Sequence, residues 1–203
     1  RALLLDRLEQ ALARARWHER LVALLYLDLD RFKNINDSLG HEVGDRLLQE
    51  VGARLHAVVR DRDTIARHGG DEFVILLDDI ATEADVGHIA QKLLDALLTP
   101  FQIDGHMLYV TGSIGISSYP SDGESPPSLL RNADAAMYRA KEAGKNTFRF
   151  YSQDMSARAI QRLTLENNLR LAIERGEFVL HYQPQVDVQT GTVVGAEALL
   201  RWQ

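Results

Sequence analysis

The sequence contains no cysteine. It can therefore form no disulfide and no thiolate metal site, and it offers no cysteine nucleophile. Long hydrophobic runs are also missing: the longest, at residues 21–27, falls far short of the roughly 20 residues that cross a bilayer, and no signal peptide is visible. We expect a cytoplasmic protein with no membrane contact in these residues. Because the chain starts at Arg1, we interpret it as a fragment of a longer protein whose upstream regions could carry an anchor.

The chain also lacks an excess of positive charge. It carries 23 Lys and Arg against 29 Asp and Glu, which gives a net charge of −6. A nucleic-acid backbone requires clustered cations, so we expect no nucleic-acid partner. A nucleotide that arrives with Mg²⁺ is compatible with this charge, because the metal bridges protein carboxylates and phosphates.

The length suits one domain of about 150 residues and a remainder. We predict a first domain at 1–153 and, at 154–203, a linker helix followed by an incomplete second domain. In the first domain the hydrophobic pattern alternates between the period of strands and that of helices, which predicts an α+β fold whose central, antiparallel-containing sheet has helices packed on it. Trp17 is expected in the core. The predicted helices are 2–17, 43–58, 82–98, 126–143 and 156–175, and the predicted strands are 20–29, 64–66, 73–77, 101–103, 107–117, 147–151, 178–183 and 193–200.

Two glycines precede two acids in the most informative stretch, Arg67-His68-Gly69-Gly70-Asp71-Glu72-Phe73. Because glycine adopts positive φ without strain, Gly69-Gly70 predicts a tight two-residue turn between strands. The turn would hold Asp71 and Glu72 on rigid backbone. Most adjacent acids in a turn merely face solvent, so the pair alone does not define a site.

A third acid lies at the end of the predicted strand 20–29. If that strand lies beside the glycine turn, the carboxylates of Asp28 and Asp71 converge, as a hard cation such as Mg²⁺ requires. The backbone carbonyl of Leu29 could supply a further oxygen. Taken alone, Asp28-Leu29-Asp30 is more typical of a solvated strand end than of a metal site.

Residues 32–45 form a polar, glycine-containing turn that leads into a helix. Acid and amide side chains provide the acceptors and donors that recognise the edge of guanine, so Asn36 and Asp45 are candidate guanine-binding residues. The alternative is that Asn36 belongs to turn chemistry and that Asp45 is a favourable charge in a first helical turn.

These segments together resemble the GGDEF family of diguanylate cyclases over about residues 1–153. Several motifs in the same order and spacing carry far more weight than one short pattern. The matching stretches are Asp28-Leu29-Asp30, Phe32-Lys33, Ile35-Asn36-Asp37, Gly40-His41, Gly44-Asp45, the glycine turn, and Ala133-Asp134-Ala135-Ala136-Met137-Tyr138-Arg139-Ala140-Lys141 with Gly144-Lys145-Asn146.

The resemblance implies a nucleotide-cyclase, palm-like fold and condensation of two GTP molecules into cyclic di-GMP, with release of two pyrophosphates. It implies that Asp28, the Leu29 carbonyl and Asp71 hold Mg²⁺, with Mn²⁺ as an alternative. Glu72 would bind a second metal or assist deprotonation of the attacking 3′-hydroxyl. Each domain would hold one GTP, so the resemblance implies a transient homodimer.

The resemblance also assigns the substrate-binding residues. Asn36 and Asp45 would recognise guanine, as their chemistry suggests independently. Lys33, Lys141 and Lys145 would neutralise the phosphates, Lys33 as part of the catalytic site. Lys145 stands where many relatives have arginine, so it keeps the charge without the two-pronged geometry of a guanidinium.

A product-inhibition site is implied a few residues before the glycine turn, where Arg60 and Asp63 match the family's Arg-x-x-Asp motif. Arginine can bind phosphate and stack on guanine, and the aspartate can accept hydrogen bonds from the base. The alternative is an exposed charged loop at the end of a helix.

Residues 178–202 resemble the start of an EAL domain, a TIM-like barrel that hydrolyses cyclic di-GMP. Glu197 matches the first metal-binding glutamate of that family. The other ligands would lie after Gln203, so we expect no phosphodiesterase activity from the residues given. The main alternative to a cyclase is therefore a GTP-binding module that regulates an adjoining EAL phosphodiesterase in the full-length protein.

Overall fold

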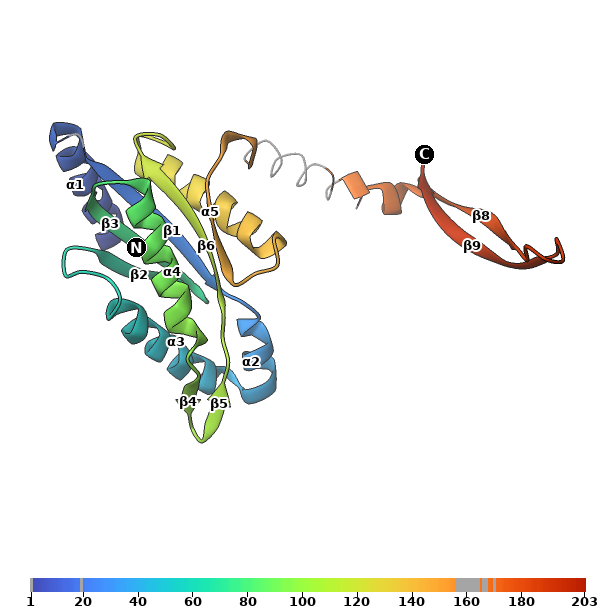
Figure 1. The fold of residues 1–203 in the computed structure, drawn as a ribbon, viewed down its shortest axis with the longest axis horizontal. Helices are drawn as coiled ribbons and strands as arrows, with labels where there is room; N and C mark the ends of the chain where they lie inside the picture. The colour runs from blue at the N-terminus through green and yellow to red at the C-terminus, as the bar shows by residue number, and fades with distance from the viewer. Residues whose placement is uncertain (1, 19, 156–164, 166–167, 170) are drawn as a thin grey trace. The chain divides into compact units, whose positions relative to one another are not determined.

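The computed structural model describes residues 2–18, 20–155, 165, 168–169 and 171–203. The chain divides into two compact units, Arg1–Ser156 and Ala157–Gln203. The first unit is a five-stranded sheet with helices on both faces (Figure 1). Its elements are α1 (Ala2–His18), β1 (Leu21–Leu29), α2 (Phe32–Leu39), α3 (His41–His56), β2 (Thr64–Gly69), β3 (Glu72–Ile80), α4 (Glu83–Leu98), β4 (Phe101–Ile103), β5 (His106–Leu108), β6 (Gly112–Tyr119), α5 (Pro126–Glu142) and β7 (Thr147–Phe150).

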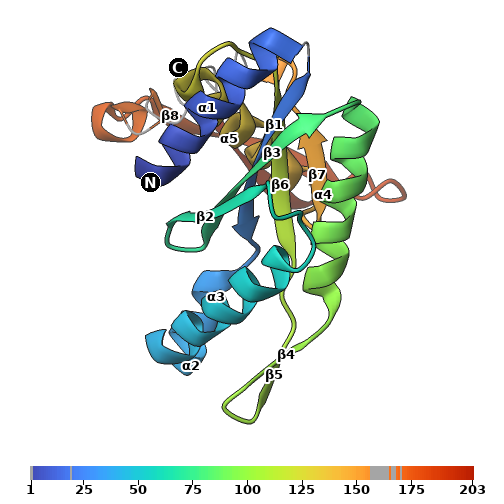
Figure 2. The ribbon, with the colours of Figure 1, turned by 90° about the vertical axis from the view of Figure 1, so that its left-hand side faces the viewer.

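The strand order in the sheet is β2-β3-β1-β6-β7. β1 is central and pairs antiparallel with both β3 and β6, whereas β7 pairs parallel with β6. Figure 2 shows β1 between its two neighbours, with α3 and α4 on the near face. The predicted α+β fold with a mostly antiparallel sheet is confirmed.

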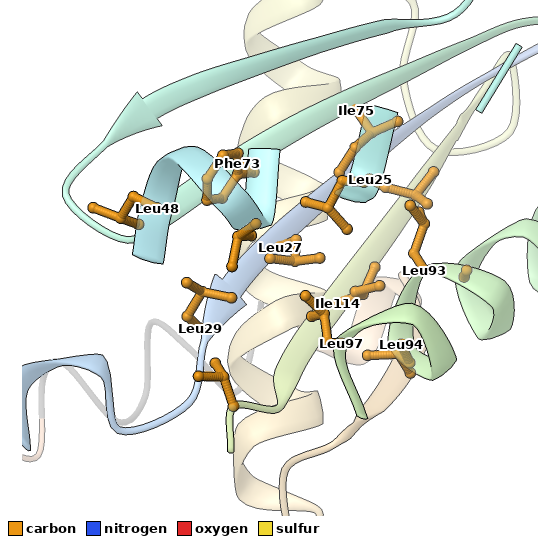
Figure 3. Close-up of a cluster of buried hydrophobic side chains, with 14 of the residues drawn as sticks. Leu25, Leu27, Leu29, Leu48, Phe73, Ile75, Leu93, Leu94, Leu97 and Ile114 are labelled. Atoms are coloured by element: carbon orange, nitrogen blue, oxygen red, sulfur yellow. The ribbon is translucent and has the colours of Figure 1, made fainter. Parts of the chain in front are cut away.

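Both faces of β1 are covered, which explains why its sequence is apolar without alternation. Leu25 and Leu27 point into a cluster with α3 and α4 (Figure 3). Leu24 and Tyr26 point to the opposite face, where α1 and α5 pack. Since successive residues of a strand point to opposite sides, one strand builds both cores.

α1 buries Leu4, Leu8 and Leu12 against the sheet, as its periodicity predicts. The prediction that Trp17 belongs to the core is wrong, because 86% of its surface is exposed. The physical reason is helical geometry: five residues after Leu12, Trp17 is turned about 140° away from the buried stripe.

The helix caps follow the sequence. Thr82 and Asp85 form the predicted capping box at the start of α4. Ser125, just before Pro126, forms a second capping box with Ser128 at the start of α5. The segment 32–39 is a helix, α2, and not the turn that its polar residues predicted. Gly40, at φ +87°, separates α2 from α3.

Two strand predictions also change. The strand predicted at 107–117 is divided into β5, which pairs only with β4 in a small separate sheet, and β6, which joins the main sheet. In the β2–β3 turn, Gly69 still pairs with Glu72, so the two turn residues are Gly70 and Asp71. Only Gly70 has positive φ, at +51°.

The second unit contains β8 (Phe178–Val186) and β9 (Val193–Trp202), an antiparallel hairpin. Gly191 turns the chain at φ +70°, close to the predicted position. Most of the predicted helix at 156–175 lies outside the described residues. Ala172 is the one described residue of this unit that is buried. Across the described parts of the chain, no helix is both long and apolar enough to cross a bilayer.

Gly115 lets α5 pack directly on the sheet. A Cβ atom at Gly115 would lie 2.0 Å from the Ala133 carbonyl oxygen and 2.0 Å from the Met137 nitrogen. These are backbone atoms, which cannot rotate away. Glycine at this position therefore fixes how closely α5 approaches β6.

We predict that Gly115→Ala lowers the free energy of unfolding by at least about 3 kcal/mol, because α5 must shift as a unit. Urea unfolding followed by circular dichroism measures the loss. Gly52→Ala on α3 is the control, since its new Cβ would meet the Phe73 ring at an ordinary 3.7 Å. We expect that variant to stay within about 1 kcal/mol of the original chain. Equal effects of the two substitutions would contradict this view of the α5 interface.

Candidate active site

Three carboxylates, from β1, from β3 and from the β2–β3 turn, lie near one another at one end of the sheet. Asp28, at the end of β1, is directly opposite Glu72, the first residue of β3. The amide of Leu29 donates a hydrogen bond to the carbonyl of Asp71 at 3.3 Å, which ties the end of β1 to the β2–β3 turn. The structure thus brings Asp28, Leu29, Asp71 and Glu72 together.

Asp28 is a buried charge that pairs directly with a cation. It is 8% exposed, and its Oδ2 lies 2.7 Å from Nζ of Lys141 on α5. Burial raises the pKa of Asp28, and the carboxylates of Asp71 and Glu72 raise it further, whereas Lys141 opposes the rise. The site therefore concentrates negative charge where water cannot fully screen it.

Glu72 is oriented by Tyr26, a residue that the sequence analysis did not select. The Tyr26 hydroxyl donates to Oε2 of Glu72 at 2.8 Å. Burial and this acceptor together raise the pKa of Tyr26 well above its usual range, so the hydroxyl stays protonated and keeps donating. The signal in the sequence is a single tyrosine within an aliphatic strand, two residues before Asp28 and hence on the same face.

Asp30 has a structural role. Its carboxylate accepts hydrogen bonds from the Thr111 hydroxyl at 2.7 Å and the Ser113 hydroxyl at 2.8 Å. It also accepts one from the backbone amide of Asn146 at 3.2 Å. With its oxygens used in this way, Asp30 joins β1, β6 and the segment after α5. Of the two acids in Asp28-Leu29-Asp30, Asp28 thus belongs to the candidate site and Asp30 stabilises the surrounding fold.

The donor set suits a magnesium ion that the protein does not enclose. Carboxylates and a backbone carbonyl are the hard oxygen ligands that Mg²⁺ prefers. Within the described residues, no group of three or more His, Cys, Asp or Glu side chains is close enough to hold a metal. Mg²⁺ usually takes one or two carboxylates and completes its shell with water and substrate phosphates. The residues at the end of β1 fit that pattern.

The predicted guanine-binding residues lie on adjacent helices. Oδ1 of Asn36 on α2 is buried and has no hydrogen-bond partner within the described part of the chain. A Cβ at Gly44 would lie 1.9 Å from that atom, so a larger residue there would require the Asn36 amide to move. Asp45 follows on α3 with a largely exposed carboxylate, 4.0 Å from Nη2 of Arg67. An orphaned buried acceptor is rare, and it marks Asn36 as a group that awaits a donor.

The three lysines occupy different positions. Lys141 contacts Asp28, as described above, and Lys33 is exposed in the first turn of α2. Lys145 follows α5 at φ +66° and lines a cavity of about 430 Å³ together with Arg31, Tyr109 and Asn146. The structure therefore separates the cations predicted to neutralise phosphates, with only Lys141 already bound to an acid of the site.

Asp63 organises the loop that contains the predicted inhibition motif. It is 5% exposed and accepts hydrogen bonds from the Arg60 amide at 3.0 Å and the Asp78 amide at 3.3 Å. The Arg60 side chain is exposed beside it. Next to this loop lies a cavity of about 550 Å³, where Arg14 pairs with Asp78, and both Arg20 and Arg62 pair with Asp79.

Glu197 lies in the second unit, on β9, where it pairs with Gln183 of β8 and is exposed. Its predicted role as a metal ligand of an EAL domain stays a prediction.

We predict that Asp28→Asn stabilises the fold at pH 7. The pKa of Asp28 in the folded state is raised above its usual 3.8, so the folded state binds the proton more tightly than the unfolded state. The contribution of Asp28 to the free energy of unfolding therefore falls as pH rises from 3.8 through the pKa of Asp28 in the folded state, and it stays low at higher pH. The increase in the free energy of unfolding caused by Asp28→Asn should therefore appear above that pH range and vanish below pH 3.8.

Asp30→Asn provides the matched control for this prediction. It replaces an equally buried acid whose oxygens accept three hydrogen bonds, so we expect a loss of about 2 kcal/mol or more at pH 7. Chemical denaturation at a series of pH values measures both variants. Destabilisation by Asp28→Asn at neutral pH would show that the carboxylate contributes to stability instead of opposing it.

Known proteins share both the sequence and the fold of this chain. The family profile "Diguanylate cyclase, GGDEF domain" matches residues 1–147, and the profile "EAL domain" matches residues 166–203. The "Bifunctional diguanylate cyclase/cyclic di-GMP phosphodiesterase MucR" of Pseudomonas aeruginosa is 49% identical over 203 residues. That match covers 100% of this chain but only 30% of MucR.

Solved structures agree. The GGDEF domain of PA1120 (YfiN or TpbB) from Pseudomonas aeruginosa superposes with a TM-score of 0.74 at 39% identity, covering 75% of this chain and 95% of that one. The coiled coil and GGDEF domain of DgcB from Caulobacter crescentus, solved in complex with c-di-GMP, gives a TM-score of 0.65 at 26% identity, covering 74% and 79%. The chain therefore belongs to the GGDEF family of diguanylate cyclase domains, and residues 166–203 match an EAL domain.

Proposed function

We propose that this chain condenses two GTP molecules into cyclic di-GMP and releases two pyrophosphates. The observation that carries the proposal is the meeting of Asp28, Asp71 and Glu72 at the end of β1, beside Lys141. Family membership supports the reaction type. The chain spans only 30% of MucR, so the activity of the whole protein stays part of the proposal.

In this reaction the 3′-hydroxyl of each GTP attacks the α-phosphate of the other. Each attack forms a bond between the 3′-oxygen and the α-phosphorus. It breaks the bond between the α-phosphorus and the oxygen that bridges to the β-phosphate, so pyrophosphate leaves, and the 3′-hydroxyl loses its proton. A bound Mg²⁺ stabilises the charge that develops on the phosphates. Asp28, the Leu29 carbonyl and Asp71 would hold that ion, and Mn²⁺ has the same preference for oxygen ligands.

The residues of the chain would position the substrate and accept its proton. Tyr26 holds one oxygen of Glu72, so this carboxylate is oriented to accept the proton of the 3′-hydroxyl or to bind a second metal. Asn36 and Asp45 would bind guanine. Lys33, Lys141 and Lys145 would offset the charge of the triphosphate, which otherwise repels the three acids of the site.

A single domain with one GTP cannot close the ring. The two 3′-hydroxyls and the two α-phosphates must face each other, which requires two domains in contact. We therefore propose a transient homodimer as the active species. A GTP-binding module that regulates an adjoining EAL phosphodiesterase in the full-length protein is the second candidate, favoured by the match of residues 166–203 and by the bifunctional name of MucR.

Product analysis tests the proposal. We expect cyclic di-GMP after incubation with GTP and Mg²⁺, at a rate that rises more steeply than linearly with protein concentration, because the active species contains two chains. Chromatography of the products against known standards measures it. Asp71→Ala is the control, in which we expect product formation to fall by a factor of at least about 100, as a lost metal ligand predicts. Intact GTP at every protein concentration would instead favour the regulatory module.

We also propose that the exposed Arg60 binds the cyclic dinucleotide product and thereby inhibits the enzyme. Arg60→Ala should leave the initial rate near that of the original chain and raise the product concentration needed for half-inhibition. The substitution leaves the loop intact, because Asp63 accepts from the backbone amide of Arg60 and not from its guanidinium. Initial rates at increasing cyclic di-GMP measure the effect. Unchanged inhibition would reject this role for Arg60.

A further inference from the structure

Among the described residues, Asp28 forms an ion pair with Lys141 alone. Its Nζ lies 2.7 Å from Oδ2 of Asp28, and the side chains of Lys141 and Asp28 are 29% and 11% exposed. Because water reaches this pair only in part, the attraction between the two charges is stronger than at an open surface. The carboxylate proposed to bind metal is thus already neutralised by a cation of the protein.

The fold builds this contact through two matched distances. α5 touches β6 at Gly115, which is the sheet partner of Tyr26. From Met137 at that contact to Lys141, the helix advances about 6 Å, and from Tyr26 to Asp28 the strand advances about 6.8 Å. The helix therefore delivers Lys141 to the end of β1, where Asp28 lies.

We infer that Lys141 is a resident counter-ion of the metal site, which blocks bare metal from Asp28 and leaves it only when a nucleotide supplies phosphates. This inference rests on the proposed cyclase function and adds a coupling between metal and substrate. The reason is competition for one oxygen. A metal ion about 2.1 Å from Oδ2 would lie within about 5 Å of the ammonium, where the two positive charges repel each other strongly.

Lys141 can resolve this competition by rotating about its four side-chain bonds. When a metal–nucleotide complex arrives, the metal takes over Asp28 and the triphosphate offers several negative charges to the released ammonium. Each partner then has an opposite charge. Bare metal brings no new anion for Lys141, so its binding must break the ion pair without a phosphate to replace it. Metal and nucleotide should accordingly bind with positive coupling.

Manganese binding to the 203-residue chain tests this directly, without turnover. Free Mn²⁺ is measured by electron paramagnetic resonance at pH 8, first alone and then with a non-hydrolysable GTP analogue. For Lys141→Met we expect bare Mn²⁺ to bind about three- to tenfold more tightly, because its competitor is gone. With the analogue present, the same variant should bind more weakly than the original chain, because a phosphate partner is lost.

Two variants control the experiment. Lys145→Met removes a neighbouring lysine that forms no ion pair within the described residues, and it should leave bare Mn²⁺ binding unchanged. Lys141→Arg keeps the charge and should behave like the original chain. Lys141→Gln serves the same comparison as methionine if circular dichroism shows that Lys141→Met is unfolded.

In the Lys141→Met variant, bare Mn²⁺ should bind more tightly, and Mn²⁺ with the analogue should bind more weakly. A purely structural role of Lys141 would instead weaken Mn²⁺ binding in both measurements. Unchanged or weaker binding of bare Mn²⁺ by a folded Lys141→Met or Lys141→Gln variant would overturn the inference. Formation of cyclic di-GMP by the original chain is measured separately. If product forms and bare-metal affinity does not rise in the variant, the inference fails while the proposed function stands.

Discussion

The antiparallel pairing of β1 with β3 governs the candidate site. Because Asp28 is opposite Glu72, the end of a strand buried on both faces meets the first residue after the β2–β3 turn. Carboxylates that are placed this close oppose each other's ionisation, and burial at Asp28 adds to the cost. The unfavourable electrostatics are characteristic of functional sites, which often keep charges that stability alone would remove.

The surrounding scaffold compensates for that cost with specific contacts. Asp30 joins β1 to β6 and to the residues after α5 through three hydrogen bonds. Tyr26 holds Glu72 from within the strand, and Lys141 neutralises Asp28 from α5. The contact of Lys141 with Asp28 depends on the close approach of α5 to the sheet at Gly115. A glycine on β6, two positions from the residue opposite Asp28, therefore helps to place the cation beside this carboxylate.

Much of the fold follows from local patterns in the sequence. The apolar run of β1, the stripe of α1, and the capping box at Thr82 predicted their elements correctly, because each depends on residues close together in the chain. Predictions failed where tertiary contacts decide. The polar residues of α2 form a helix that packs on α3, and Trp17 falls outside the stripe that the sheet covers.

The sequence by itself determined the family and the central strand, and it selected Asp28, Asp71 and Glu72 as candidates, because residue types at fixed spacing encode them. The tertiary structure alone decided which groups meet. The Tyr26–Glu72 and Lys141–Asp28 contacts join residues 46 and 113 positions apart, and the distinct roles of Asp28 and Asp30 depend on which donors surround each carboxylate. No spacing along the chain contains that information, since it arises only when β1, β3, β6 and α5 pack together.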